Sequence, residues 1–235
     1  NIINIVAAGN AVVFNPHPGG ARSAALAVRA YNEAIHAALG IENLVCTVEK
    51  PTLDTFSALT KDEHIRLLCV TGGPAVVAAA MKSGKRAICA GPGNPPVVVD
   101  ETADLDAAAQ TVAGQYINAG QVCLAGTRIL VEASVEAEFL AKVRAAVGQM
   151  TVGDPRLPTT RVGPLIHPDH FARVAGFVDR AKAAGADLLW GGGRDAAGAL
   201  YFQPTMFAGV SPGDEIAQDE VFGPVLTWQT FADDA

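Results

Sequence analysis

The segment Ile65-Arg-Leu-Leu-Cys-Val-Thr-Gly-Gly-Pro-Ala-Val-Val-Ala-Ala-Ala-Met-Lys-Ser-Gly-Lys-Arg-Ala-Ile-Cys-Ala90 decides the fold class of this chain. Residues 65–70 form a short apolar run that is typical of a buried strand. Pro74 stands at the first position of a predicted helix over 74–82, where its missing N–H has no cost. Residues 86–90 form a second apolar run. A strand, a helix and a strand in this order predict two parallel strands joined by a crossover helix.

The same alternation extends toward the N-terminus. Residues 11–15 and 43–48 are predicted strands. Between them, apolar residues recur at helical spacing from Ala24 to Leu39, and Gly40 marks the end of that helix. Residues 51–59 form a shorter predicted helix, which we expect Pro51 to open. This part of the chain predicts a parallel sheet covered by helices on both faces.

From residue 95 onward, apolar runs of strand length again alternate with helical segments. The predicted strands are 95–99, 128–132, 187–190 and 225–231. The predicted helices begin near Thr102 to Asp104, at Ser134 and at Pro168. Glycine and proline cluster in Gly91-Pro-Gly-Asn-Pro-Pro96, which is typical of a domain boundary. We therefore expect a first domain at residues 1–91 and a second at residues 92–235.

Composition excludes several classes of protein. The chain has 235 residues, of which 50% are hydrophobic and 17% are charged, whereas disordered chains combine low hydrophobicity with high charge. A formal net charge of −7 disfavours nucleic acid as a partner. The longest stretches without a charged residue, 1–21 and 107–127, are interrupted by polar residues and glycines, so we expect no membrane-spanning segment. Both ends have the pattern of internal segments, so we expect a piece of a longer protein.

Four cysteines are widely spaced, and no C-x-x-C pair occurs. Neither a zinc site nor a disulfide framework is expected from this spacing, and a reducing cytoplasm is the expected location. Cys46, Cys69 and Cys89 lie inside predicted strands, where we expect them to be buried as small hydrophobic residues.

Cys123 has a different setting. It lies in Asn118-Ala-Gly-Gln-Val-Cys-Leu-Ala-Gly-Thr-Arg128, between a predicted helix and a predicted strand. We expect Gly120, Ala125 and Gly126 to let a substrate approach and to leave backbone N–H groups available. A thiolate is the strongest side-chain nucleophile near neutral pH. The pattern alone leaves two interpretations open, a nucleophile or a buried structural cysteine.

Other motifs are less specific. Gly72-Gly73 lies between a predicted strand and helix, where backbone N–H groups can bind phosphate, although neither G-x-G-x-x-G nor a P-loop occurs. His17 follows a predicted strand and is either a ligand-binding or an ordinary turn residue. His167-Pro-Asp-His170 has the residue types of a metal site, but Pro168 favours a solvated helix start. Asp219 to Pro224 places carboxylates beside an aromatic residue and a turn.

Together these motifs resemble the aldehyde dehydrogenase superfamily. The segment 118–132 resembles that family's cysteine segment, with Cys123 at the nucleophile position, and the segment 219–225 resembles its cofactor-ribose segment. Four further motifs fall in the family's order: Gly9-Asn-Ala-Val-Val-Phe14, Val70-Thr-Gly-Gly73, Val152-Gly-Asp-Pro155 and Gly163-Pro-Leu-Ile166. The resemblance covers essentially the whole chain. It implies an α/β fold, with a Rossmann-type parallel-sheet cofactor domain and an α/β catalytic domain, both incomplete.

The first half resembles one branch of the family, the CoA-acylating enzymes of ethanolamine and propanediol utilisation. The similar segments are 10–18, 70–75 and 90–100. Asn15 stands where hydrolytic members have lysine, and Ala90 stands where they have a glutamate that activates water (Cys89 in a register shifted by one). From about Tyr116 onward, the chain is more similar to the hydrolytic members.

The resemblance implies roles for individual residues. Cys123 is the expected nucleophile, and its thioester is the expected intermediate. NAD is the expected cofactor, with NADP as an alternative, and CoA is the expected co-substrate. Contacts with the cofactor are expected from Asn15, Thr71, Gly72, Gly73, Glu220 and Phe222. No residue is expected to bind a metal.

The resemblance thus implies NAD-dependent oxidation of a small aldehyde to an acyl-CoA. One alternative is a hydrolytic NAD(P)-dependent enzyme that yields a carboxylic acid, and another is an inactive nucleotide-binding fragment. The family also implies a homo-oligomer for the full-length protein. The expected location is the cytoplasm, and the ethanolamine and propanediol branch adds the interior of a bacterial microcompartment.

Overall fold

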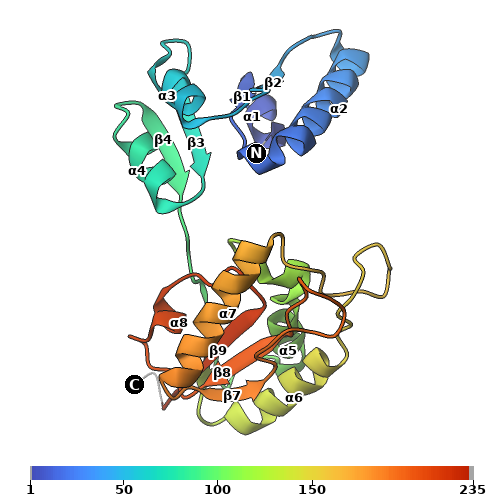
Figure 1. Ribbon diagram of the computed structural model, residues 1–235, viewed down its shortest axis with the longest axis vertical. Coiled ribbons are helices and arrows are strands. Elements are labelled where there is room, and N and C mark those ends of the chain that lie inside the picture. Colours follow the sequence, from blue (N-terminus) through green and yellow to red (C-terminus); the bar gives the residue numbers. More distant parts are fainter. Residues whose placement is uncertain (1, 233–235) are drawn as a thin grey trace. The chain divides into compact units, whose positions relative to one another are not determined.

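The computed structural model describes residues 2–232, and the chain divides into two compact units, 1–91 and 92–235. The division falls inside the glycine- and proline-rich segment Gly91 to Pro96 (Figure 1). Each unit has its own helices and its own parallel strands.

The first unit alternates helices and strands. Its elements are α1 (Ile2–Ala7), β1 (Val12–Phe14), α2 (Ala21–Leu39), β2 (Val45–Thr47), α3 (Leu53–Lys61), β3 (Leu67–Thr71), α4 (Pro74–Met81) and β4 (Arg86–Ala90). All strand pairing is parallel, as the sequence predicts. Instead of one sheet, however, the described strands form two separate pairs, β1 with β2 and β3 with β4. The strands of the first pair have only three residues each, so their ladder has only three paired positions.

The helix ends of this unit follow local chemistry. Gly40 ends α2 in the left-handed conformation (φ 67°), as predicted. Pro51 does not open α3, because the helix begins two residues later, at Leu53, with Thr52 as its cap. The Thr52 side chain accepts a hydrogen bond from the Thr55 N–H, and the Thr55 side chain accepts one from the Thr52 N–H. This reciprocal cap gives acceptors to the N–H groups of Thr52 and Thr55. A proline side chain has no hydrogen-bonding atom and could not provide such an acceptor.

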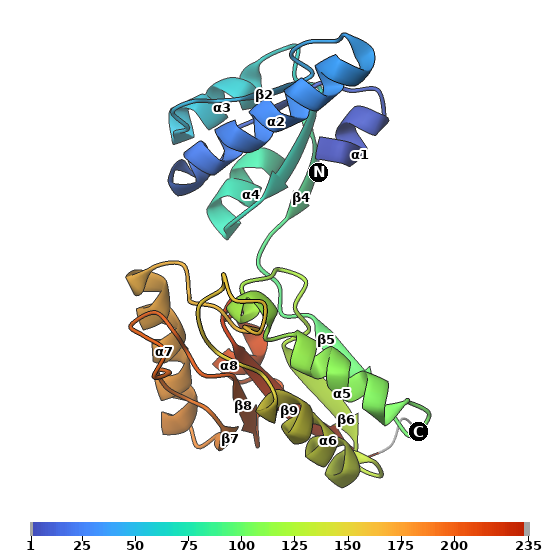
Figure 2. The same cartoon turned by 90° about the vertical axis from the view of Figure 1, so that its right-hand side faces the viewer.

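The second unit is built on one five-stranded sheet. Its elements are β5 (Pro96–Val99), α5 (Leu105–Gly114), β6 (Arg128–Glu132), α6 (Glu136–Gly148), α7 (Pro168–Ala183), β7 (Asp187–Trp190), β8 (Thr205–Ala208), α8 (Glu215–Gln218) and β9 (Val225–Phe231). The strand order is β5-β6-β9-β8-β7, and only β7 is antiparallel to its neighbour. Figure 2 shows α5 and α6 on one face of the sheet and α7 on the other.

The core of the second unit lies on both faces of this sheet. Phe139 of α6 stacks on Trp228 of β9 with ring centroids 5.3 Å apart. Tyr116 is fully buried, and its hydroxyl donates a hydrogen bond of 2.9 Å to the Thr205 carbonyl. Burial raises the pKa of this hydroxyl, so it stays protonated as a donor.

The helix expected to begin with a Ser134 cap starts differently. Val135 occupies the cap position of α6 and makes no side-chain cap bond. The Ser134 hydroxyl instead donates to the Glu132 carboxylate over 2.7 Å. A short polar side chain near a helix start has several local acceptors, and here the neighbouring carboxylate competes successfully with the cap.

The strand cysteines are less buried than expected. Cys46, Cys69 and Cys89 do lie in β2, β3 and β4, but Cys69 is exposed and the other two are half-buried. Alternation along β3 puts Leu68 on the covered face and Cys69 on the opposite face, which is why that cysteine is accessible. Among the described residues, no helix is both long and apolar enough to cross a membrane.

We expect the Tyr116→Phe substitution to lower the free energy of unfolding by about 1–2 kcal/mol, because the buried Thr205 carbonyl loses its donor. Urea denaturation followed by tryptophan fluorescence measures this change. Tyr201→Phe is the control, since Tyr201 is only half-buried and no hydrogen bond of its hydroxyl is described within residues 2–232. Equal losses in the two variants would contradict the assignment.

Candidate active site

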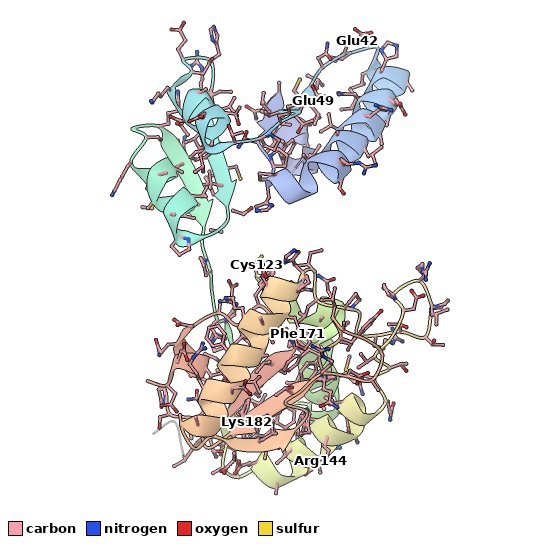
Figure 3. All side chains as sticks on the ribbon, viewed as in Figure 1. Glu42, Glu49, Cys123, Arg144, Phe171 and Lys182 are labelled. Atoms are coloured by element: carbon pink, nitrogen blue, oxygen red, sulfur yellow. The ribbon has the colours of Figure 1, made fainter. Side chains whose placement is uncertain are left out.

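Three segments meet at one edge of the second unit. Residues 92–95, 118–127 and 219–224 directly precede the parallel strands β5, β6 and β9, which are neighbours in the sheet. Because these strands run in the same direction in the sheet, their amino ends share an edge and the preceding segments converge there. In Figure 3, Cys123 lies at the end of the unit where α7 begins, away from Lys182 at the other end of that helix.

Cys123 stands in a β-turn on this edge. The Ala125 N–H donates to the Val122 carbonyl over 3.0 Å, which leaves Cys123 and Leu124 as the central residues of the turn. The thiol is free and exposed. Among the hydrogen bonds described for residues 2–232, none uses the backbone N–H of Cys123 or Leu124. An accessible thiol beside open N–H donors suits a nucleophile whose attack creates an oxyanion, and exposure disfavours the buried structural cysteine.

The turn is preceded by three residues in the left-handed conformation. Asn118, Ala119 and Gly120 have φ values of 55°, 54° and 66°. Such backbone costs on the order of 1–2 kcal/mol for each residue other than glycine. Asn118 and Gln121 offset part of this cost, because each side-chain amide donates to the other's backbone carbonyl, over 3.1 and 3.0 Å.

Gln121 also ties the cysteine segment to a distant loop. Its side-chain carbonyl accepts the Ile166 N–H over 2.9 Å, and its amide reaches the Pro164 carbonyl over 3.3 Å. Gln121 was not among the residues predicted for the site. Its position two residues before Cys123 was visible, but its partners lie far along the chain and carry no local signal.

The glycines of the cysteine segment serve packing inside the protein. A Cβ at Gly120 would overlap the Gly223 backbone carbonyl, and one at Gly126 would overlap the Val97 side chain. The Gly126 N–H is already used, since it donates to the Gln115 side chain over 2.7 Å. Ala125 is buried. The expectation that these small residues make room for a substrate is therefore wrong, because their free space is filled by neighbouring segments.

Glu220 and Phe222 belong to the segment that packs against Gly120. Both side chains are half-buried, and Phe222 has a φ of 56°. The Gly93 N–H approaches one Glu220 carboxylate oxygen at 3.4 Å. The Asn94 amide donates to the carbonyls of Ala217 (2.9 Å) and Asp219 (3.4 Å). These bonds connect the start of β5 to the segment before β9.

Asn94 also accepts a hydrogen bond from the Thr127 hydroxyl. Its one side chain therefore contacts the cysteine segment as well as the Glu220 segment. The structure thus brings Cys123, Glu220 and Phe222 onto one connected edge of the second unit.

The two histidines of 167–170 have different surroundings. His167 is exposed and caps α7 by accepting the Asp169 N–H over 3.2 Å, as expected for a solvated helix start. His170 departs from that expectation, since its Nε2 is partly buried and lies 2.7 Å from the Phe222 carbonyl. Within residues 2–232, no group of three or more His, Cys, Asp or Glu side chains is placed to hold a metal ion.

The candidate residues of the first unit follow the carboxyl ends of its strands. Thr71 is the last residue of β3, Gly72 and Gly73 connect it to α4, and all three are exposed. Gly73 is the cap residue of α4, and no atom outside its chain neighbours lies within 4 Å of a Cβ built there. No side chain caps this helix start, Pro74 has no N–H, and the Val76 and Val77 N–H groups donate to the Gly73 carbonyl. The N–H groups of Gly73 and Ala75 have no partner described within residues 2–232, so they can donate to an anionic ligand.

Asn15 and His17 are engaged locally. Asn15 accepts the Thr55 hydroxyl over 2.6 Å and donates to the Thr52 carbonyl over 3.4 Å, which ties the end of β1 to the start of α3. His17 caps the short 3₁₀ turn at Pro18–Gly20 by accepting the Gly19 N–H over 3.1 Å. This favours the interpretation of His17 as a turn residue. Asn15 and Thr71 follow strands of different pairs, and no hydrogen bond between them is described in residues 2–232.

The whole chain, residues 1–235, matches the sequence model of the aldehyde dehydrogenase family. The chain belongs to the aldehyde dehydrogenase family. The resemblance stated from its motifs and the α/β fold class are thereby confirmed, and solved structures agree. The structure of the NAD-dependent aldehyde dehydrogenase from Sinorhizobium meliloti matches this chain with a TM-score of 0.85 and 31% sequence identity. The match covers 95% of this chain and 45% of the Sinorhizobium meliloti chain.

Curated relatives carry two kinds of name. The betaine aldehyde dehydrogenase of Rhizobium etli is 34% identical over 234 residues, which are 96% of this chain and 47% of that protein. The acetylating acetaldehyde dehydrogenase EutE of Salmonella typhimurium is 42% identical over 182 residues, 77% of this chain and 38% of that protein. The chain spans about half the length, or less, of the curated relatives it matches.

We expect the Gly120→Ala substitution to lower the free energy of unfolding by about 2–4 kcal/mol, since the new Cβ overlaps the Gly223 carbonyl at a positive φ. Urea denaturation provides the measurement. Gly114→Ala is the matched control, because a Cβ there meets nothing within 4 Å in α5, and we expect a change of at most about 0.5–1 kcal/mol in the stabilising direction. A Gly120 variant as stable as the Gly114 variant would refute the close contact.

Proposed function

We propose that the protein containing this chain oxidises a small aldehyde with NAD and transfers the acyl group to CoA. The observation that carries the proposal is the exposed Cys123 turn, with its open N–H groups, on one connected edge with Glu220 and Phe222. The name of the acetylating relative supports CoA as the acceptor.

In this proposal, Cys123 acts as the nucleophile. Its thiolate forms a bond to the aldehyde carbon, and the carbonyl oxygen takes up the negative charge. The Cys123 N–H, open in the turn, donates to this oxyanion. Removing one such donor typically lowers the rate by about 100- to 1000-fold. After oxidation the acyl group remains on Cys123 as a thioester, until the CoA thiol attacks it and Cys123 leaves.

The chain's residues fit a nicotinamide cofactor. The Gly93 N–H lies near one Glu220 carboxylate oxygen, and no hydrogen bond of the other oxygen is described within residues 2–232, so it can accept from ribose hydroxyls. Phe222 contributes an aromatic face. In the first unit, Thr71 and Gly72 lead to the start of α4, where the N–H groups of Gly73 and Ala75 have no partner described within residues 2–232 and suit phosphates. Asn15, in place of the family lysine, alters the contact with the adenosine ribose. A bound nicotinamide cofactor supplies the hydride acceptor.

Ala90 supports CoA over water as the acyl acceptor. It is exposed at the end of β4, and its methyl group cannot take a proton from water. The alternative is a hydrolytic enzyme. The second-half motifs and the longer match to betaine aldehyde dehydrogenase favour it. NADP is the alternative cofactor. The proposal also includes a homo-oligomer for the full-length protein, and a location in the cytoplasm or inside a bacterial microcompartment.

The full reading frame that encodes this chain should form NADH from acetaldehyde or propionaldehyde only when CoA is present. Absorbance at the NADH band, with and without CoA, measures this dependence. Oxidation that proceeds equally well without CoA would refute acyl transfer and favour hydrolysis. We expect Cys123→Ser to abolish activity in both conditions, because a hydroxyl is a far weaker nucleophile near neutral pH. Cys69→Ser, which changes another exposed thiol, is the control and should keep activity.

We expect Ala90→Glu to divert the thioester from CoA toward water, because a carboxylate can act as the general base for hydrolysis. The ratio of free acid to acyl-CoA, measured by chromatography of the products, should rise by about 10- to 100-fold. Ala90→Gln is the matched control, since it has the same length and no basic group at neutral pH. An unchanged ratio in Ala90→Glu would place the base position elsewhere.

A further inference from the structure

One face of α7 holds the segment that carries Glu220 and Phe222. The Arg173 guanidinium donates to the Glu220 carbonyl over 2.6 Å and also to the Val221 carbonyl. The His170 Nε2 lies 2.7 Å from the Phe222 carbonyl. A carbonyl can only accept, so Nε2 carries the proton and donates. Three consecutive backbone carbonyls therefore receive hydrogen bonds from two side chains of one helix.

The Val174 side chain of α7 packs against the same segment. A Cβ at Gly223 would lie 2.7 Å from the Val174 side chain. His170, Arg173 and Val174 stand at positions i, i+3 and i+4, which share a face of a helix. Phe177, one turn further along α7, supports the Arg173 side chain, because the Arg173 guanidinium lies 4.8 Å from the centre of the Phe177 ring.

This arrangement determines where the segment's side chains can lie. The segment is outside any strand, so its carbonyls have no ladder partners and the α7 side chains satisfy them instead. With those carbonyls held by α7, the Glu220 carboxylate lies near the Gly93 N–H. Phe222 keeps its φ of 56° while its ring meets the His170 imidazole edge-on at 5.9 Å.

We propose that His170 and Arg173 are positioning residues that fix Glu220 and Phe222 for cofactor binding. The proposal rests on the proposed function, in which Glu220 contacts the nicotinamide ribose. Neither side chain needs to touch the cofactor, because both act through the backbone of residues 220–222.

Arg173→Met, made in the protein encoded by the full reading frame, tests whether Arg173 holds the segment 219–224. We expect the KM for NAD to rise by about 10- to 100-fold, as for the loss of a charged hydrogen-bond donor, with a much smaller change in kcat. Hydrogen exchange of the cofactor-free protein should show faster exchange in the peptide 219–224. The matched control is Arg180→Met, since Arg180 lies over the same Phe177 ring at 4.8 Å but pairs with Glu215. That control should leave both readouts near the wild-type values.

The histidine is tested by a conservative pair. His170→Leu removes the donor and should raise the KM for NAD, whereas His170→Gln keeps an N–H donor and should restore most of the affinity. Equal effects of Arg173→Met and Arg180→Met, or unchanged exchange in 219–224, would overturn the proposal. Glu220→Ala separates the two levels of inference. An unchanged KM in that variant would overturn the cofactor role proposed for Glu220, and the exchange data would still decide whether α7 holds the segment.

Discussion

The close backbone contact between Gly120 and Gly223 is the constraint on which the candidate site depends. No side chain fits at either position, because Gly120 abuts the Gly223 carbonyl and Gly223 abuts Val174 of α7. The backbones of the cysteine segment and the Glu220 segment therefore touch directly, and α7 packs on the Glu220 segment through the Val174 side chain. This contact places the proposed nucleophile and the proposed cofactor-binding carboxylate on neighbouring backbone segments. The packing energy of the contact offsets the conformational strain of the left-handed backbone at Asn118, Ala119 and Phe222.

Neutral amide side chains connect these layers. Asn94 joins the segments before β5, β6 and β9, and Gln121 joins the cysteine segment to the loop at Pro164 to Ile166. An amide group both donates and accepts, so it can bridge loops whose peptide groups point in opposite directions. Amides do not titrate, so these bridges persist across the pH range in which thiol and imidazole groups change charge. The hydrogen bonds of Asn94 and Gln121 are therefore unaffected by the ionisation changes that the proposed chemistry requires.

Local pattern was sufficient for most elements and insufficient for the contacts between them. Strands such as Arg128–Glu132 and the helix at Pro168–Ala183 were predictable because apolar spacing and caps are local signals. The short elements Ile2–Ala7, Thr205–Ala208 and Glu215–Gln218 were not predicted, since four to six residues hold too little periodicity. Cys123 was predicted as the nucleophile from its segment and the family resemblance, and this role stays a prediction. The packing roles of Gly120 and Gly126, and the hydrogen bond of His170, depend on partners distant in sequence, which a single sequence does not reveal.

The two units place their candidate residues at opposite ends of their strands, and this has a physical consequence. In the first unit, β3 is followed by the start of α4, where helix N–H groups and the positive end of the dipole favour an anionic ligand. In the second unit, the segments before β6 and β9 come after the C-terminal ends of α5, at Gly114, and of α8, at Gln218. In the proposed function, the open N–H groups of the Cys123 turn are a source of donors for the developing oxyanion. In the proposed function, the binding of phosphates and the stabilisation of an oxyanion thus depend on different backbone segments, so the sequence of one segment can change without altering the other.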